Sequence, residues 1–266
     1  MNKNRVLIKI GGQAFSDKSG FEELAAAIKS IDAEVIIVHG GGAEISKALK
    51  ETKRETVFVD GVRVTQKQDV EIVESVLSET VNGRIAAYLS ESGIECVRLS
   101  GKSSASEDSG ALLIAKKTLR NGNDIGYVGE IVRVNPGIVW EAISQKRVPV
   151  VSPISANENG VTLNVNADTA AAALAVGSKC TDLVYFSDVP GVMDEKNEVL
   201  PYLSAQAGSF LIQTGIITGG MVAKLESIFD AVSRGVERVH ITQWQGATTL
   251  KHLLDGRDIT KTTIHK

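Results

Sequence analysis

The stretch EVIIVHGGG, at residues 34–42, indicates the fold class of this chain. Its apolar run is nearly continuous, which is typical of a strand buried on both faces of a sheet. Three glycines at 40–42 then lead into a helical pattern that ends near Lys50. One glycine suffices for a turn, and each further glycine costs conformational entropy on folding. We therefore interpret the glycines as an anion site at the positive end of a helix; the alternative is a tight strand-to-helix turn.

A second glycine loop follows the first apolar strand, VLIKI at residues 6–10. Gly11 and Gly12 come directly after this strand, and Lys9 stands between two isoleucines within it. A lysine in so apolar a strand suggests a role for its charge, although an edge strand would also tolerate it. Two glycine loops at the ends of two neighbouring strands indicate a phosphate site better than either loop alone.

Strands and helices alternate along the rest of the chain. The predicted helices cover residues 21–31, 66–91, 167–176 and 220–234, with others after Pro136 and from Ser204, and the predicted strands cover 95–99, 148–151, 183–186 and 238–241. This alternation predicts an α/β fold with a mostly parallel central sheet and helices on both faces. Strand-like residues 128–134 and a turn at 158–160 suggest antiparallel hairpins in addition. No linker divides the chain, so residues 1–266 are expected to form a single domain.

The composition argues against several classes of protein. The chain has 29 Lys and Arg against 32 Asp and Glu, a net charge of −3. Without a basic cluster to neutralise phosphates, we expect no nucleic-acid partner. No apolar run reaches about 18 residues, so we expect no membrane partner and a cytoplasmic location. Cys96, Cys180 and four scattered histidines match no metal-site spacing, so no protein metal ligand is expected.

Known nucleotide-binding fingerprints are absent. Gly101-Lys102-Ser103 resembles the end of a P-loop, but Cys96 occupies the position of its first glycine. The dinucleotide-binding pattern fails at Ile45, where its last glycine would stand. The signatures of protein kinases are missing as well.

Polar residues at the starts of two predicted helices can each be interpreted in two ways. In NVNAD, at 164–168, Asn166 can cap a helix and Asp168 can complement its dipole, but capping leaves Asn164 unexplained. Function and capping are equally supported there. Lys224 follows Gly219-Gly220 in the first turns of another helix, where the dipole disfavours a cation. It indicates either an anionic partner or a solvated surface lysine.

Arg63, in GVRVT at 61–65, completes the set of candidate residues. Its planar guanidinium could bind a carboxylate through two bonds, and a surface arginine is the alternative. Glycine loops, two lysines, an aspartate and an arginine suit phosphoryl transfer, because that reaction needs positioning and neutralised oxygen charge. They suit best an acceptor that is already an anion, such as a carboxylate, because it needs no general base.

In order, these motifs resemble those of the amino-acid kinase family nearly end to end. The matching segments are IKIGG at 8–12, VHGGG at 38–42, GVRVT at 61–65, LSGK at 99–102, YVGE at 127–130, PVVSPI at 149–154, NVNAD at 164–168, SDVPGV at 187–192 and GIITGGM at 215–221. The resemblance implies a three-layer α/β/α fold. It further implies ATP-dependent phosphorylation of the γ-carboxylate of N-acetyl-L-glutamate, in arginine biosynthesis, with Mg²⁺ held mainly by the nucleotide phosphates.

The resemblance also implies roles for individual residues. Lys9 and Lys224 would neutralise the transferring phosphoryl group, and Asp168 would orient both lysines. The glycines that would hold the γ-phosphoryl group and the acceptor are Gly11, Gly12, Gly41 and Gly42. On the acceptor, the α-carboxylate side would be bound by Arg63 and Asn164.

The nucleotide would lie along the C-terminal part of the chain. The residues implied to line it are Asp188, Val189, Gly191, Val192, Met193, Ile216, Ile217 and Thr218. The lobe up to about residue 175 would then bind the acceptor, and the lobe from about 176 to 266 would bind ATP. Two positions depart from the family pattern: Gly83 follows Asn82 where a lysine is common, and Thr262-Thr263 replaces a Gly-Thr pair.

Alternatives to this activity remain open. A sister kinase acting on carrier-linked aminoadipate or another amino-acid carboxylate is one, and a catalytically silent amino-acid sensor is another. The short segment before the first strand leads us to expect a homodimer that arginine does not inhibit. An apolar stripe on the helix at 66–91 fits either a subunit interface or packing against the sheet; it consists of Val70, Val73, Leu77, Val81, Ile85 and Leu89.

Overall fold

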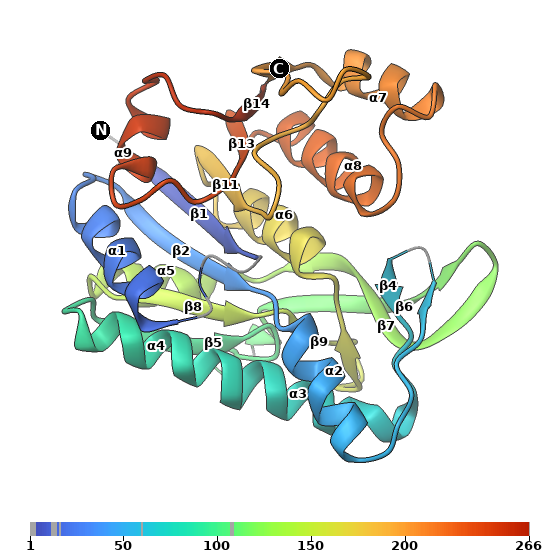
Figure 1. Ribbon diagram of the computed structural model, residues 1–266. Coiled ribbons are helices and arrows are strands. Elements are labelled where there is room, and N and C mark those ends of the chain that lie inside the picture. The colour runs from blue at the N-terminus through green and yellow to red at the C-terminus, as the bar shows by residue number, and fades with distance from the viewer. Residues whose placement is uncertain (1–3, 12–14, 16, 60, 107–108, 266) are drawn as a thin grey trace.

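The computed structural model describes residues 4–11, 15, 17–59, 61–106 and 109–265. An eight-stranded sheet forms its centre (Figure 1). The strand order is β12 (Tyr202–Leu203), β14 (Thr262–His265), β13 (Arg238–Thr242), β11 (Asp182–Phe186), β1 (Arg5–Ile10), β2 (Glu34–His39), β8 (Val148–Ser152) and β5 (Cys96–Ser100). Neighbouring strands run parallel except for the antiparallel pair β13–β14. The predicted mostly parallel sheet is confirmed.

Helices cover both faces of this sheet, as the near-continuous apolar strands require. On one face lie α1 (Lys18–Lys29), α2 (Gly42–Glu51), α3 (Val70–Ser75), α4 (Asn82–Glu91) and α9 (Thr249–Leu254), whose buried side chains share one core cluster. On the other lie α5 (Gly137–Ser144), α6 (Ala167–Gly177) and α8 (Gly220–Ser233), with α7 (Ala205–Gln213) packed on α8. The arrangement is the expected three-layer α/β/α sandwich.

Antiparallel hairpins extend one end of the molecule (Figure 1). The strands β6 (Leu113–Arg120), β7 (Asn123–Val134), β9 (Ile154–Ala156) and β10 (Thr162–Asn164) close into a small barrel, and β3 (Phe58–Val59) pairs with β4 (Val62–Arg63). The sequence predicted part of β7 and missed β6, whose polar residues face solvent on a hairpin. Pairing with β7, rather than burial between helices, makes β6 a strand.

The helix predicted over 66–91 is continuous but not uniform. A 3₁₀ turn at Lys67–Asp69 precedes α3, and a π-helical segment, Val76–Val81, joins α3 to α4. Five members of its apolar stripe are at most 3% exposed within the single chain: Val73, Leu77, Val81, Ile85 and Leu89. These five side chains therefore pack in the core of the chain itself, whereas Val70 is partly exposed; a subunit interface at this helix stays a prediction.

The parallel topology decides where the polar candidates meet. Because β2, β1 and β11 are adjacent and parallel, the loops at their carboxyl ends share one edge of the sheet. Along β1 the side chains alternate, so Leu7 and Lys9 face the layer of α6, whereas Val6 and Ile8 face the layer of α1. In the part of the chain that the structure describes, no helix is both long and apolar enough to cross a membrane.

Candidate active site

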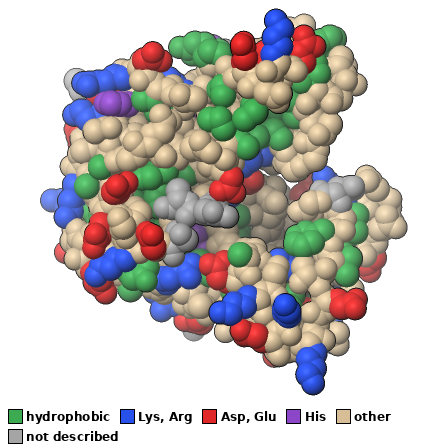
Figure 2. All heavy atoms as spheres, viewed as in Figure 1, with side chains coloured by type: hydrophobic (Ala, Val, Ile, Leu, Met, Phe, Trp, Pro, Cys, Tyr) green, Lys and Arg blue, Asp and Glu red, His purple; other side chains and the backbone are tan. Residues whose placement is uncertain are grey.

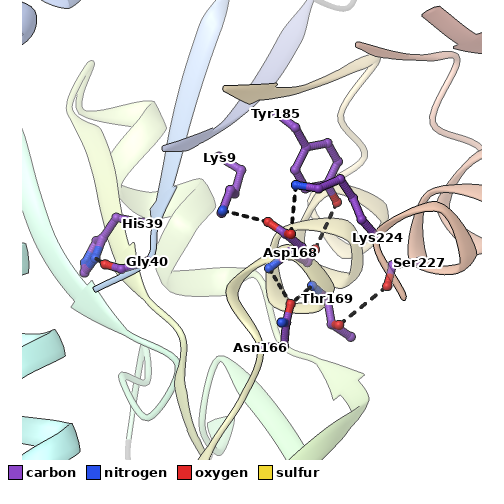
Figure 3. A network of polar contacts seen from close by, with 9 residues as sticks. All are labelled: Lys9, His39, Gly40, Asn166, Asp168, Thr169, Tyr185, Lys224 and Ser227. Atoms are coloured by element: carbon purple, nitrogen blue, oxygen red, sulfur yellow. Dashed lines mark hydrogen bonds and ion pairs between the residues drawn. The ribbon is translucent and has the colours of Figure 1, made fainter. Parts of the chain in front are cut away.

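Lys9, Asp168 and Lys224 form one cluster near the carboxyl end of β1 (Figure 3). Lys9 Nζ lies 2.7 Å from Asp168 Oδ1, and Lys224 Nζ lies 2.9 Å from Asp168 Oδ2. The side chains of Lys9 and Lys224 are only 12% and 9% exposed. One carboxylate thus holds two nearly buried ammonium groups that come from a strand and a helix far apart in sequence.

The start of α6 fixes the carboxylate. Asn166 caps this helix, because its Oδ1 accepts hydrogen bonds from the backbone N–H groups of Asp168, at 2.8 Å, and Thr169, at 3.2 Å. Tyr185, from β11, donates its hydroxyl to the Asp168 backbone carbonyl at 2.9 Å. Its ring lies 4.9 Å from Lys224 Nζ, a cation–π contact. The predicted cap at Asn166 is therefore confirmed, and Asp168 pairs with the two lysines; a function of this segment stays a prediction.

The charges of this cluster set its protonation. Burial by itself would raise the pKa of Asp168, but the adjacent ammonium groups of Lys9 and Lys224 outweigh burial and lower that pKa to about 2. Burial also lowers the pKa of Lys224, an effect that Asp168 opposes. At neutral pH the aspartate is therefore ionised and can bind the two lysine side chains through its charge. The charge of Asp188 also acts on Lys224.

The first glycine loop adjoins Lys9. A Cβ added at Gly11 would lie 2.5 Å from Lys9 Nζ and 3.1 Å from the backbone oxygen of Phe186. Because real side chains do not approach so closely, Gly11 keeps open the space that the ammonium group occupies. Gly12, expected to hold ATP phosphates, lies outside the described residues.

The second glycine loop joins β2 to α2 beside the first. Gly40 donates its backbone N–H to the carbonyl of Ile10 at 3.2 Å, which ties the two loops together. Gly41 precedes α2, and a Cβ there would lie 2.7 Å from Leu77 Cδ2 of the π-helical segment. The first turn of α2 has no side-chain cap, so its backbone N–H groups stay available to an anion.

His39, just before these glycines, was not singled out from the sequence. It is 1% exposed, and it lies on the opposite side of β2 from the lysine cluster, as Figure 3 shows. Its Nδ1–H donates to Gly40 O at 2.7 Å, because a carbonyl oxygen can only accept. Its Nε2 is then the unprotonated nitrogen, and it lies 3.1 Å from Asn82 Nδ2, whose two N–H groups are shared among Nε2 and the carbonyls of Leu99 and Val150. Burial lowers the pKa of His39 to about 4, so this imidazole is neutral.

A cavity of about 360 Å³ opens between the N-termini of α2 and α6. Gly41, Gly42, Arg63 and Asn164 all line it, so the four residues expected to bind the acceptor share one pocket. Its walls are otherwise largely apolar, with Ile45, Phe58, Leu77, Val128 and Pro153. Such a pocket fits a small molecule that carries an anionic group at one end.

Arg63 makes more hydrogen bonds within the protein than the sequence suggested. Its side chain donates to Gly42 O at 2.8 Å, to Ser46 Oγ at 2.9 Å and to Thr56 Oγ1 at 3.3 Å. The residue is 7% exposed, which excludes the interpretation as a plain surface arginine. Because Arg63 binds the carbonyl of Gly42, it also braces the glycine loop.

The residues expected along the nucleotide occupy the loops of the C-terminal part. Asp188 and Thr218 are exposed, whereas Val192 and Ile217 are 1% and 5% exposed. The side chains of Val192 and Ile217 therefore belong to the core, and their backbone N–H groups donate within the protein, to Thr262 Oγ1 and to Leu211 O. Val189, Met193 and Ile216 are partly exposed, and Gly191 is buried where a Cβ would lie 2.6 Å from Thr262 Oγ1. Asp188 lines a second cavity, of about 430 Å³, together with Lys9 and Gly11.

A third cavity, of about 260 Å³, separates α8 from the β6–β7 hairpin. It is lined by Arg120 of the hairpin, Ser227 of α8 and Asn166 at the start of α6, among others. Figure 2 shows the hollow between these parts of the surface. Thr169 and Ala223, which also line this cavity, are direct sequence neighbours of Asp168 and Lys224.

Among the described residues, no group of three or more His, Cys, Asp and Glu side chains is placed to hold a metal ion. The carboxylate of Asp168 is paired with two lysines.

Comparisons with known proteins agree with this architecture. The family model of the amino acid kinase family matches residues 4–243. An acetylglutamate kinase from Rhodospirillum centenum is 38% identical over 245 residues, covering 87% of this chain and 78% of the relative. One from Caldanaerobacter subterraneus is 40% identical over 242 residues, covering 89% and 79%.

A solved structure of similar fold comes from Streptococcus mutans UA159. The smu.665 protein superimposes with a TM-score of 0.75 at 28% identity, over 98% of both chains. Family model, relatives and solved structure each span most of the sequence. The chain belongs to the amino acid kinase family.

Proposed function

We propose that this chain transfers the γ-phosphoryl group of ATP to the γ-carboxylate of N-acetyl-L-glutamate, forming N-acetyl-L-glutamyl 5-phosphate. The observation that carries the proposal is the pair of ammonium groups held by one carboxylate, that of Asp168, beside a pocket lined by Arg63 and Asn164. The acetylglutamate kinases among the relatives support this choice of acceptor. In a cell the reaction would serve arginine biosynthesis.

The reaction needs no proton transfer. An oxygen of the acceptor carboxylate forms a bond to the γ-phosphorus, and the bond from that phosphorus to the bridging β,γ-oxygen breaks, so ADP leaves with the electron pair. Both partners are anions, and their repulsion is the main barrier that the protein must offset. Lys9 and Lys224 would supply positive charge at the transferring group, and Asp168 would keep both ammonium groups at fixed positions.

The acceptor would occupy the 360 Å³ cavity. Arg63 and Asn164 would bind its α-carboxylate side, and the N–H groups at the start of α2, from Gly41 and Gly42, would steady the acceptor near the phosphoryl group. The apolar walls leave little to satisfy a free, charged α-amino group. An acetylated amino group, which is neutral, suits such walls better than an ammonium group.

The nucleotide would lie on the C-terminal side, with its phosphates directed to the lysine cluster. Gly11 and Gly12 would contact the phosphates. Magnesium, bound to those phosphates, supplies further neutralisation of their charge when the nucleotide is present. The loops around Asp188 and Ile216–Thr218 would line the adenosine.

One assay separates this proposal from its alternatives. ADP release is measured with N-acetylglutamate, glutamate and aminoadipate side by side, each with MgATP. We expect turnover with N-acetylglutamate and a kcat/KM at least about 100-fold lower with glutamate, whose charged amino group the pocket disfavours. Preference for aminoadipate or its carrier-linked form would establish a sister kinase. Binding of an amino acid without any ADP release would establish a sensor.

A further inference from the structure

Thr65 joins the two residues expected to bind the acceptor. Its Oγ1 accepts a hydrogen bond of 3.0 Å from Asn164 Nδ2, and its own hydroxyl faces the backbone carbonyl of Arg63 at 3.5 Å. Thr65 is 1% exposed. It follows Arg63 by two residues, whereas Asn164 is 99 residues away in sequence. A single buried hydroxyl therefore lies between both halves of the acceptor pocket.

The backbone of Thr65 is fixed as firmly as its side chain. Its N–H donates to Ile125 O at 3.1 Å, and its carbonyl accepts from the N–H of Tyr127 at 2.7 Å. A Cβ at Gly126, between these partners, would lie 2.2 Å from the Thr65 carbonyl oxygen. Only glycine permits this approach, so β7 holds Thr65 in one place and Thr65 cannot follow a moving Asn164.

These contacts determine which atoms Asn164 shows to a ligand. In the bond with Asn164 the Thr65 hydroxyl oxygen is the acceptor, because the amide nitrogen donates to it at 3.0 Å. The amide must then turn its nitrogen towards Thr65, which leaves its oxygen and its second N–H for other partners. Without the hydroxyl, the amide would be free to rotate by about 180° and to exchange oxygen for nitrogen at the pocket.

We propose that Thr65 is a positioning residue for acceptor recognition: its buried hydroxyl sets the orientation of the Asn164 amide, and Asn164 in turn binds the acceptor. The inference rests on the proposed function, because it takes the 360 Å³ cavity as the acceptor site. Thr65 does not line that cavity. It acts through Asn164, so its removal should weaken acceptor binding and leave ATP binding alone.

Two matched variants test the hydroxyl. Thr65→Val keeps the branched shape and removes the acceptor of the Asn164 bond, whereas Thr65→Ser keeps the hydroxyl and removes a methyl group. We expect Thr65→Val to raise the KM for N-acetylglutamate about tenfold, the usual effect of one lost hydrogen bond. Its KM for ATP and its kcat should change by less than about threefold, and Thr65→Ser should restore the wild-type KM to within about twofold.

A double-mutant cycle tests whether the effect of Thr65 on acceptor binding passes through Asn164. In an Asn164→Ala background, Thr65→Val should change kcat/KM for N-acetylglutamate by less than about twofold, because the amide that it orients is gone. Thermal unfolding of each variant shows that the protein is folded, and Thr65→Ala provides the same comparison if the valine variant unfolds.

Three results would overturn the inference. They are an unchanged acceptor KM in folded Thr65→Val, an equal rise in the KM for ATP, and a full Thr65→Val effect in the Asn164→Ala background. A wild-type protein without activity on N-acetylglutamate contradicts the proposed function instead. An active wild type with an unaffected Thr65→Val variant contradicts only the role of Thr65.

Discussion

Lys224 Nζ lies 2.9 Å from Asp168 Oδ2, so a nearly buried ion pair joins the first turn of α6 to the second turn of α8. A lysine this near a helix N-terminus is unfavourable for the helix dipole. Asp168 compensates that charge, and the same carboxylate binds Lys9 from the other side. Asp168 therefore brings two lysine side chains together at a place where neither helix would favour a cation alone.

Removal of either lysine should affect turnover more than binding. In Lys9→Ala and in Lys224→Ala we expect kcat to fall by about 100-fold or more, because charge on the phosphoryl oxygens is best stabilised during transfer. The KM values for ATP and N-acetylglutamate should change far less. Steady-state kinetics measure both, with exposed Lys50→Ala as the control. A large rise in KM at constant kcat would assign these lysines to ground-state binding.

Asp168→Asn should lower both stability and activity. It leaves Lys9 and Lys224 facing each other without a counter-charge, and we expect a loss of about 3 kcal/mol in the free energy of unfolding. The folded-state pKa is about 2, below the ordinary 3.8, so this stabilisation is complete above about pH 4 and fades as the pH falls towards 2. Denaturant titration at pH 7 and pH 3 measures the free energy of unfolding of the variant and the wild type. Equal stability of variant and wild type at pH 7 would contradict the ion-pair argument.

Arg63→Lys should raise the KM for N-acetylglutamate and leave the KM for ATP nearly unchanged. Lysine keeps the charge but lacks the planar fork that bonds Gly42 O, Ser46 Oγ and Thr56 Oγ1 together. We expect about a tenfold rise, typical of a lost hydrogen bond to a charged group. The control is Arg234→Lys, a change in an exposed i,i+4 pair. A parallel rise in both KM values would place Arg63 nearer the nucleotide.

Sequence patterning captured the layers and the central sheet because these depend on local runs of apolar residues. The strand at 34–39 and the helix at 167–177 were predicted to within a few residues, since each is marked by an apolar run or by a cap such as Asn166. The strands β6 and β14 were missed. Each becomes a strand by pairing with a distant or antiparallel neighbour, and a local pattern does not encode that.

The site was predictable in its residue types and not in its connections. The glycine loops stood out because glycine costs conformational entropy on folding. Lys9, Lys224 and Arg63 stood out because each is a cation in an apolar strand or near a helix start. That Asp168 bridges the two lysines followed only from the resemblance to the family, since capping explained Asp168 as well. Nothing local marks His39 or Thr65, because their roles come from side chains that arrive from other elements.

His39 ties the glycine loop to the long helix, and only the neutral imidazole can make both of its bonds. Protonation would place a proton on Nε2, against the Asn82 amide nitrogen, in a site that is 1% exposed. Burial is the largest cause of the lowered pKa, and the charges of Arg84 and Lys9 lower it further, against a smaller opposing effect of Glu44 and of the bond to Gly40. The loop should therefore be most stable when His39 is uncharged.

Stability should consequently fall as the pH drops from about 6.5 to about 4. In that window an unfolded chain protonates His39 and the folded chain does not, so unfolding takes up a proton and the free energy of unfolding decreases with acid, by about 3 kcal/mol over the full window. Buried His240, whose pKa burial also lowers, adds to the slope. Denaturant titrations at pH 7, 6, 5 and 4 measure how the free energy of unfolding changes with pH. His39→Gln should be less stable than the wild type at pH 7 but lose less stability towards pH 4, and equal slopes for the two proteins would show that the His39 imidazole is not held neutral by the fold.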